Sequence, residues 1–435
     1  MPNVYIQQKN QIVPAHLFSR CISSNGVKRQ TTYLGKAYRL LAVGERDSSD
    51  KEYGLLIIDC LFKTIFSLGV WLISQELRDN WKTVFSGKRI IHYYVDSQLP
   101  RATARIIKNQ LFPPNQDHWH ALRQVICKLR QQGGIYSKKA ALLQKSLNHF
   151  FIKKCPLTLK TSRLKNKESF LFNTTSSYPA YFNQKFNPHR PLHLDDSPSF
   201  YHFMPTGEGV EDFWVDFANA NLGGGCFGHG FVQEEKLVAE VPEFAAHIAN
   251  HWENGGCTIQ TRNGRSPNPY LLKGLHQVQE IDKKIYGHKT LEKIAQPALL
   301  QRTLCLDTPK KINILAIAAP DLPNSELEQQ WNLVTIADNL NTLIAGFTLV
   351  KEQSANPIIH SGKLGCGAFN NDAHLIYLLH CLAAQYTGVK VKLYGYEDKE
   401  ARAYQDSWNQ IAPNLINKSL AECTRLIHDH LWSVH

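Results

Sequence analysis

The stretch FWVDFANANLGGGCFGHGFVQEE, residues 213–235, lies midway along the chain and decides how the rest of the sequence is interpreted. Its first residues are mostly aromatic or β-branched, which is typical of a short buried strand. Five glycines follow, and a glycine without a Cβ lets a ligand approach bare main-chain N–H groups. The loop then enters an expected helix at 232–237, whose first N–H groups have no partner within the helix. Together these features predict an anion-binding site.

Two adjacent acids, Glu234 and Glu235, distinguish this stretch from an ordinary phosphate loop. Carboxylates repel a phosphate unless they face another part of the ligand, so the pattern indicates acid chemistry beside a bound phosphate. A second glycine stretch, SGKLGCGAFNNDAHL, occupies 361–375 and leads from an expected strand into an expected helix. Strands at 311–322 and in VKVKLYGY, alternating with helices, predict an α/β protein with three layers, in which ligand groups gather at the carboxyl ends of the strands.

The order VDFAN, GGG, seven residues and QEE is similar to the signature of the poly(ADP-ribose) glycohydrolase family of macrodomains. GCGAFNND resembles that family's later glycine loop, which usually reads GCGAFGGD. The resemblance implies an α/β/α macrodomain with a mixed central sheet that binds ADP-ribose. It also implies a glycosidase-type ADP-ribosyl hydrolase without a cofactor or a metal.

The resemblance carries residue roles over to this sequence. The catalytic acid falls on Glu235 and the ribose-binding carboxylate on Glu234, although both could be ordinary acids in the first turn of a helix. Asp216 could instead cap the local backbone, and Tyr394, in the position of the adenine-stacking residue, could be part of the core. The full set expected to bind ADP-ribose is Asp216, Asn219, Gly223, Gly224, Gly225, Gln233, Gly365, Gly367, Ala368, Phe369 and Tyr394.

The chemistry requires such acids. Cleavage at an anomeric carbon passes through an oxocarbenium-like state, so a carboxyl group must protonate the leaving atom and its carboxylate must then activate water. Adjacent carboxylates raise one another's pKa, whereas a helix N-terminus lowers it, and the sequence leaves the net direction open.

The sequence also departs from the family pattern. Asn370 and Asn371 stand where the family has two glycines, Leu237 and Val238 replace Arg and Phe after QEE, and no segment matches the tyrosine-bearing clasp that holds the polymer. These departures favour removal of single ADP-ribose groups from protein over cleavage of poly(ADP-ribose). A non-catalytic ADP-ribose-binding module is the further alternative.

The general architecture is also similar to the MavL-like macrodomains of Legionella, which remove ADP-ribose from arginine, including that of ubiquitin. This similarity implies ADP-ribosylated protein, including ubiquitin, as partner and secretion into a host cytoplasm as a bacterial effector. An arginine leaving group calls for an extra acid on the substrate side. Asp321 and Asp372 are the candidates, and each could instead cap the following helix.

Composition bounds the remaining expectations. The net charge of +12 favours an anionic partner, but no nucleic-acid-binding motif accompanies it, so we expect no nucleic-acid partner. Ten cysteines without a CxxC pair are typical of a reducing intracellular setting, and the start MPNVYIQQKNQIVP does not resemble a signal peptide. Residues 54–74 are long enough to cross a membrane but contain Asp59 and Lys63, which favours buried structure and no membrane span.

Two regions are expected. The pattern over 54–150 is mainly helical, which predicts a helical accessory region over 1–170 with a frayed start. The macrodomain is expected over 171–435. Cys226 and Cys366 lie in the glycine loops, where a small side chain explains them better than a nucleophile does.

Overall fold

The computed structural model describes residues 5–8, 11–14, 30–33, 36–47, 88–96, 119–172, 178–185, 194–197, 201–255, 258–322 and 326–434. The chain divides into two compact units, Met1–His118 and Trp119–His435. The predicted boundary at 170 therefore falls inside the second unit.

The described part of the first unit is an antiparallel sheet rather than a set of helices. Its strand order is β2-β1-β5-β4-β3. The strands are β1 Tyr5–Gln8, β2 Gln11–Pro14, β3 Gln30–Tyr33, β4 Lys36–Asp47 and β5 Lys88–Asp96. The prediction of a mainly helical region is wrong for these segments, because runs such as IIHYYV contain the β-branched and aromatic residues that favour strands. The apolar stretch 54–74 lies outside the described residues.

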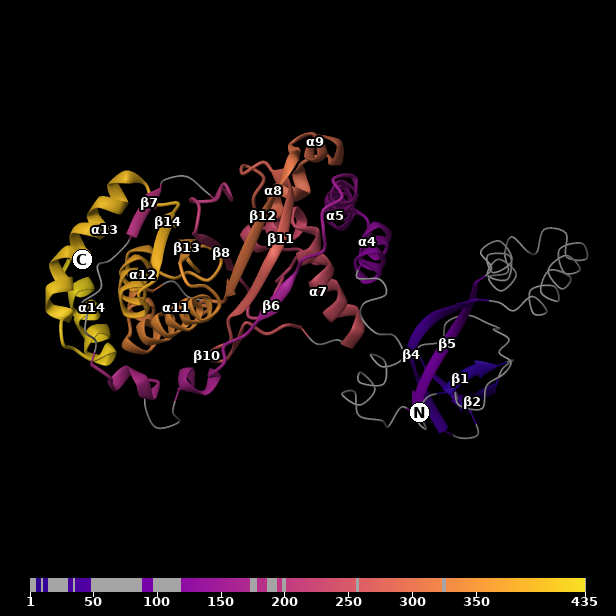
Figure 1. Ribbon diagram of the computed structural model, residues 1–435, viewed down its shortest axis with the longest axis horizontal. Coiled ribbons are helices and arrows are strands. Elements are labelled where there is room, and N and C mark those ends of the chain that lie inside the picture. Colours follow the sequence, from indigo (N-terminus) through magenta and orange to yellow (C-terminus); the bar gives the residue numbers. More distant parts are fainter. Residues whose placement is uncertain are drawn as a thin grey trace, which may run out of the picture. The chain divides into compact units, whose positions relative to one another are not determined.

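The second unit contains a seven-stranded sheet with the order β6-β11-β12-β8-β13-β14-β7 (Figure 1). The strands from β12 to β7 in this order run parallel, whereas β6 and β11 are antiparallel to their neighbours. The expected mixed sheet is thus confirmed. Its strands are β6 Lys160–Ser162, β7 Leu194–Ser197, β8 Glu211–Phe217, β11 Tyr270–Ile281, β12 Thr303–Ile317, β13 Pro357–Gly362 and β14 Lys390–Tyr394, and a separate small ribbon pairs β9 Arg262–Asn263 with β10 Ser266–Pro267.

Helices cover both faces of this sheet, which confirms the three-layer α/β/α fold. They are α4 His120–Gln132, α5 Gly134–Ile152, α6 Gln233–Glu240, α7 Pro242–Gly255, α8 His288–Lys293, α9 Gln296–Gln301, α10 Leu327–Gln330, α11 Leu333–Gln353, α12 Ala373–Thr387, α13 Asp398–Ile411 and α14 Leu420–Val434, with short 3-10 helices η3 Lys167–Phe170, η4 Ala180–Asn183 and η5 Ala412–Leu415. One core joins α11, α12 and α14 to the sheet, and a second core joins α4, α5, α6 and α7 to its other face.

The central strand β8 shows why both faces are covered. Phe213 and Val215 belong to the core of α11 and α12, whereas Trp214 between them belongs to the core of α4 to α7. Successive side chains of a strand point to opposite faces, so a continuous apolar run marks a strand that is buried on both sides.

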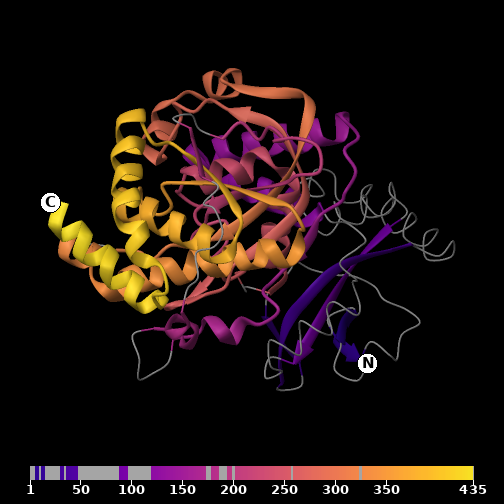
Figure 2. The ribbon, with the colours of Figure 1, turned by 60° about the vertical axis from the view of Figure 1, so that its left-hand side comes forward.

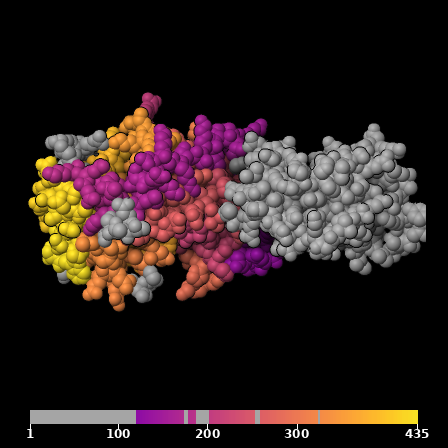
Figure 3. Space-filling model, turned by 90° about the horizontal axis from the view of Figure 1, so that it is seen from below, coloured from indigo at the N-terminus to yellow at the C-terminus, as the bar shows by residue number. Residues whose placement is uncertain are grey.

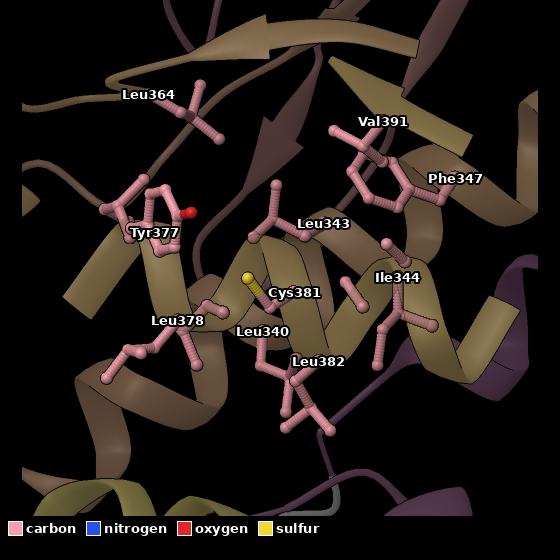
Figure 4. Close-up of a cluster of buried hydrophobic side chains, with 14 of the residues drawn as sticks. Leu340, Leu343, Ile344, Phe347, Leu364, Tyr377, Leu378, Cys381, Leu382 and Val391 are labelled. Atoms are coloured by element: carbon pink, nitrogen blue, oxygen red, sulfur yellow. The ribbon is translucent and has the colours of Figure 1, made fainter. Parts of the chain in front are cut away.

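The first of these cores is built from α11 and α12, shown with their interlocking side chains in Figure 4. The yellow helices α13 and α14 pack against this pair (Figure 2) and lie at one end of the second unit (Figure 3). Among the described residues, α11 is the helix long and apolar enough to cross a membrane, and 83% of its most apolar window is buried in this core.

The helices α4 and α5 belong to the same unit as the sheet, because their apolar residues share a core with α7 and β11. The predicted helices in this part of the accessory region are confirmed. Their assignment to a separate region is wrong, because a helical pattern shows an apolar face but does not show which surface that face covers.

The loops that follow the parallel strands meet at one edge of the sheet. Ile317 at the end of β12 lies beside Phe217 at the end of β8, and Gly362 at the end of β13 lies beside Tyr394 at the end of β14. A Cβ placed on Gly362 would lie 3.5 Å from Cζ of Phe217, so β8 and β13 also end close together. Both glycine loops begin at this edge.

Candidate active site

The first glycine loop lies directly over two carboxylates. Gly223 and Gly224 have φ values of +91° and +45°, which only glycine adopts without strain. A Cβ on Gly224 would lie 2.7 Å from Oε2 of Glu234 and 2.9 Å from Oε1 of Glu235. The glycine run is therefore needed for close approach of the backbone to these two acids.

Glu234 is held by the loop through both carboxylate oxygens. Its Oε1 accepts a hydrogen bond from the N–H of Gly223 at 2.6 Å, and its Oε2 accepts one from the N–H of Asn219 at 2.9 Å. Only 2% of the residue is exposed. The loop backbone thus fixes this side chain at the carboxyl end of β8.

Glu235 links the loop to the start of α6. Its Oε1 accepts from the N–H of Gly225 at 2.9 Å, and its Oε2 accepts from the N–H of Val232 at 2.7 Å, as the third residue of a helix does in a capping box. The alternative of an ordinary first-turn acid therefore describes part of its role. The bond from Gly225 adds a constraint that helix capping alone does not require.

Asp216 completes a cluster of three buried carboxyl groups. It has no exposed surface, and neither of its oxygens has a hydrogen-bond partner among the described residues, so it does not cap the local backbone. Burial raises its pKa well above the usual range, and the charge of Glu235 raises it further. Burial, and then the charge of Asp216, likewise raise the pKa of Glu234, so both groups favour the neutral acid.

Two polar residues predicted for the site, Gln233 and Asn219, hold its backbone in place through hydrogen bonds. Gln233 accepts from the N–H of Phe217 at 3.0 Å through Oε1, which ties the start of α6 to the end of β8. Asn219 accepts from the N–H of Asn221 at 3.1 Å through its side-chain oxygen. Both side chains are thus engaged with the backbone.

The second loop contains two asparagines where the family pattern has glycines. Asn370 has a φ of +55°, a conformation that asparagine tolerates better than most residues, and its amide donates to the carbonyl of Leu322 at 3.0 Å. Asn371 is 95% buried, donates to the carbonyl of Pro320 at 2.8 Å and accepts from Asn339 at 2.9 Å. Both side chains are therefore accommodated within the loop.

The rest of this loop is open. Gly365 has a φ of +71°, and a Cβ there would lie 2.6 Å from that of Ala319, so a glycine is required. Gly367 and Ala368 are exposed, and Phe369 is half-buried and packs against the core of α11 and α12. The exposed pair leaves the loop accessible to a ligand at the edge of the sheet.

Tyr394 is half-buried and faces inward. Its hydroxyl lies 3.0 Å from Nδ1 of His360, whose Nε2 lies 2.7 Å from Asp212, and its ring meets that of Tyr201 edge-on at 5.1 Å. Tyr396, the other tyrosine of VKVKLYGY, is 1% exposed and is part of the core. The predicted adenine platform is thus also a member of a buried hydrogen-bond chain.

The two candidate substrate-side acids differ in their surroundings. Asp372 caps α12, because its Oδ1 accepts from the N–H of Leu375 at 2.7 Å. Asp321 is exposed and follows β12, and its neighbour Leu322 donates its N–H to the carbonyl of Phe369 in the second loop. Of the two, Asp321 has the carboxyl group that faces solvent beside that loop.

The cysteines of the loops do not resemble nucleophiles. Burial raises the pKa of Cys226 well above its usual range, and the charge of Glu234 raises it further. Burial likewise raises the pKa of Cys366. Both remain thiols at neutral pH, which agrees with the interpretation that small side chains are needed there.

A cavity of about 220 Å³ opens beside the first loop. Trp252 of α7, which is 46% exposed, stacks on Phe227 of the loop with ring centroids 5.3 Å apart. The lining residues are Asn221, Leu222, Gly224, Cys226, Phe227, Gly228, Ile248, His251, Trp252, Thr258 and Ile259. The glycine that covers the two carboxylates therefore also forms part of the cavity wall.

Lys139 of α5 is not among the predicted site residues, although it contacts the first loop and is only 3% exposed. Its ammonium donates hydrogen bonds to the carbonyl oxygens of Gly225 and Gly228 at 2.6 and 2.7 Å, and to that of Gly230. A signal was present, because Lys139 lies on the same helical face as the buried residues Ile135 and Leu142. A lysine within such an apolar stripe needs a partner.

A family model matches part of the second unit. Residues 285–403, which include the second glycine loop, match the family model described as "Poly (ADP-ribose) glycohydrolase (PARG), Macro domain fold". Over this segment the chain resembles the poly(ADP-ribose) glycohydrolase catalytic domain. The first glycine loop and its acids lie outside the match.

Individual relatives carry the same name. Poly(ADP-ribose) glycohydrolase 1 of Caenorhabditis elegans is 26% identical over 191 residues, which are 39% of this chain and 21% of the relative. The chain thus spans about a fifth of that glycohydrolase. A solved structure of the glycohydrolase from Thermomonospora curvata is 12% identical, has a TM-score of 0.38 and covers 63% of this chain and 99% of its own. The structure of the Deinococcus radiodurans enzyme in complex with ADP-ribose is 11% identical, has a TM-score of 0.36 and covers 61% of this chain and 98% of its own.

Proposed function

We propose that this chain is an ADP-ribosyl hydrolase that cleaves the ribosyl bond of poly(ADP-ribose), with Glu235 as its acid and base. The observation that carries the proposal is the cluster of Asp216, Glu234 and Glu235, buried under a glycine loop at the carboxyl edge of the sheet. The family match of the second loop at the same edge supports ADP-ribose as the ligand.

In this proposal the loop amides position the acid for both steps. Glu235 protonates the leaving oxygen as the bond at the anomeric carbon breaks, and its carboxylate then takes a proton from the attacking water. The raised pKa values of Asp216 and Glu234 reduce the negative charge beside it. Neutral neighbours can also donate hydrogen bonds to ribose hydroxyls, which ionised carboxylates cannot do.

A second candidate substrate is protein with a single ADP-ribose on arginine, including ubiquitin modified in this way. The exposed carboxyl group of Asp321, next to the second loop, favours it because a carboxylate on that side can bind the positively charged guanidinium of the arginine. We place it second, because the matching family model and the relative from Caenorhabditis elegans are both named as poly(ADP-ribose) glycohydrolases.

The test compares Glu235→Gln with wild type. The substitution removes the transferable proton but keeps the shape, so we expect release of ADP-ribose from the polymer to fall by about a hundredfold or more. Binding of free ADP-ribose, measured by calorimetry, should persist. Glu240→Gln is the matched control, since Glu240 is a buried acid of the same helix that accepts from Ile281 and Gln277, away from the loop.

Different substrates distinguish the polymer glycohydrolase from the two alternatives, the arginine-specific hydrolase and the non-catalytic module. The same assay is run with poly(ADP-ribose) and with peptides that carry ADP-ribose on serine, glutamate or arginine. Release from arginine alone, lost in Asp321→Asn, would establish the second candidate. Binding of ADP-ribose without release from any substrate would identify a non-catalytic module, and undiminished turnover in Glu235→Gln would exclude the proposed mechanism.

A further inference from the structure

The glycine loop is fixed from below by a charged side chain of α5. The ammonium of Lys139 donates to three loop carbonyls, those of Gly225, Gly228 and Gly230, and is almost completely buried. An ammonium has three hydrogens, so each of them is used here. Three acceptors from one loop define the position of its backbone more strictly than a single bond does.

Gly225 connects the ammonium of Lys139 to the candidate acid Glu235. Its carbonyl accepts from Lys139, and its N–H donates to Oε1 of Glu235 at 2.9 Å. The carbonyl of Gly225 also accepts from the N–H of Gly228 at 2.8 Å, which closes a turn between two of the residues bonded to Lys139. A shift of the Lys139 ammonium would therefore move the N–H of Gly225, which donates to the Glu235 carboxylate.

A second contact of α5 acts on the same loop one helical turn earlier. The hydroxyl of Tyr136 lies 2.7 Å from Nε2 of His229, with ring centroids 5.1 Å apart. Phe231 is buried with Ile135 of the same helix. Side chains three and four residues apart share a face of a helix, so this face of α5 is a docking surface for the loop.

A buried ammonium also supplies charge. Burial lowers the pKa of Lys139 to about 8, and the interactions with Cys226 of the loop and Glu235 of α6 oppose this shift. At neutral pH the side chain is therefore charged, although burial of a charge costs free energy. The positive charge also attracts the carboxylate of Glu235.

We propose that Lys139 is a positioning residue for Glu235, and that α5 is thereby part of the hydrolase site. This inference rests on the proposed function. The lysine touches no reacting atom; it acts through the backbone of Gly225 and through its charge.

The experiment uses the full chain with Lys139→Met, Lys139→Arg and a control, Lys145→Met. Lys145 lies on the same helix and also donates to two carbonyls, those of Leu300 and Thr303, but not to the loop. Lys139→Met should lower kcat for ADP-ribose release by about a hundredfold, because small displacements of a catalytic group have effects of that size. KM should change little, and the control should resemble wild type.

The pH profile separates positioning by the ammonium from simple structural support. Above pH 8 the neutral amine has two hydrogens for three carbonyls, so wild-type kcat should fall on the alkaline side. In Lys139→Arg this fall should move to higher pH, because a guanidinium stays protonated. An unchanged alkaline limb in Lys139→Arg, or equal kcat in Lys139→Met and wild type, would overturn the inference.

Hydrogen exchange distinguishes failure of this inference from failure of the proposed function. In Lys139→Met the amides of 223–232 should exchange faster than in Lys145→Met, with the sheet still protected. If wild type hydrolyses no ADP-ribose substrate, the proposed function fails, whatever the exchange shows. If wild type is active and exchange of the loop is the same in both variants, the positioning role alone is wrong.

Discussion

Gly224 is a residue at which the site tolerates little change. It adopts a left-handed φ, and its Cα lies so close to Glu234 and Glu235 that a methyl group would collide with both carboxylates. The side chains cannot move away freely, because their oxygens are already bonded to loop amides. The identity of this residue is thus fixed by the acids below it.

We predict that Gly224→Ala lowers ADP-ribose release by about a hundredfold, because it displaces the acid from its position. The fold should survive, since the loop lies at the edge of the sheet. Kinetics with polymer substrate, together with the thermal midpoint, measure both effects. Gly207→Ala is the control, because no atom lies within 4 Å of the added methyl group. Equal rates for the two variants would contradict the prediction.

At the scale of elements, a buried ion pair joins the ribbon of β9 and β10 to α11. The guanidinium of Arg262 lies 2.9 Å from Asp338, and its Nε donates to the carbonyl of Ala318 at 3.0 Å. Both residues are 8% exposed or less. Burial raises the pKa of Asp338 to about 6 despite the nearby Arg262, so desolvation outweighs the attraction. The largest loss of stability is therefore expected when only one partner of the pair is removed.

Asp338→Asn should reduce the free energy of unfolding by about 3 kcal/mol, because it leaves a buried guanidinium without its counterion. The double variant with Arg262→Met should recover part of that loss, since both desolvated charges are then gone. Urea unfolding of the two variants and wild type gives the comparison. A double variant less stable than Asp338→Asn would contradict this, because it would show that the other hydrogen bonds of Arg262, to Ala318, Gly264 and Thr342, outweigh its desolvation.

At the scale of the whole molecule, the boundary between the units decides which helices belong to the site. The sheet, both of its helix layers and α5 lie within Trp119–His435. A fragment of residues 119–435 should therefore unfold in one cooperative transition and bind ADP-ribose. A fragment of 171–435 lacks β6, α4, α5 and Lys139, so it should be unstable and should not bind. Calorimetry of both fragments tests this, and equal stability would refute it.

Much of the fold could be predicted because its signals are local. The apolar run of β8, the glycine loops and the helix starts each depend on neighbouring residues, and the structure places them as the pattern indicates. The gathering of both loops at one edge follows from strands that run parallel. The strands of the first unit were not predicted, because short apolar runs fit both the period of a strand and that of a helix.

The sequence by itself determined the α/β class, the two glycine loops and the acids Glu234 and Glu235, because backbone freedom and apolar period are properties of consecutive residues. Only the tertiary structure decided that Asp216 is buried without a partner among the described residues, and that Lys139 holds the loop. Lys139 and its acceptors are 86 to 91 residues apart. Contacts at such separation depend on how whole elements pack, and no local pattern specifies them.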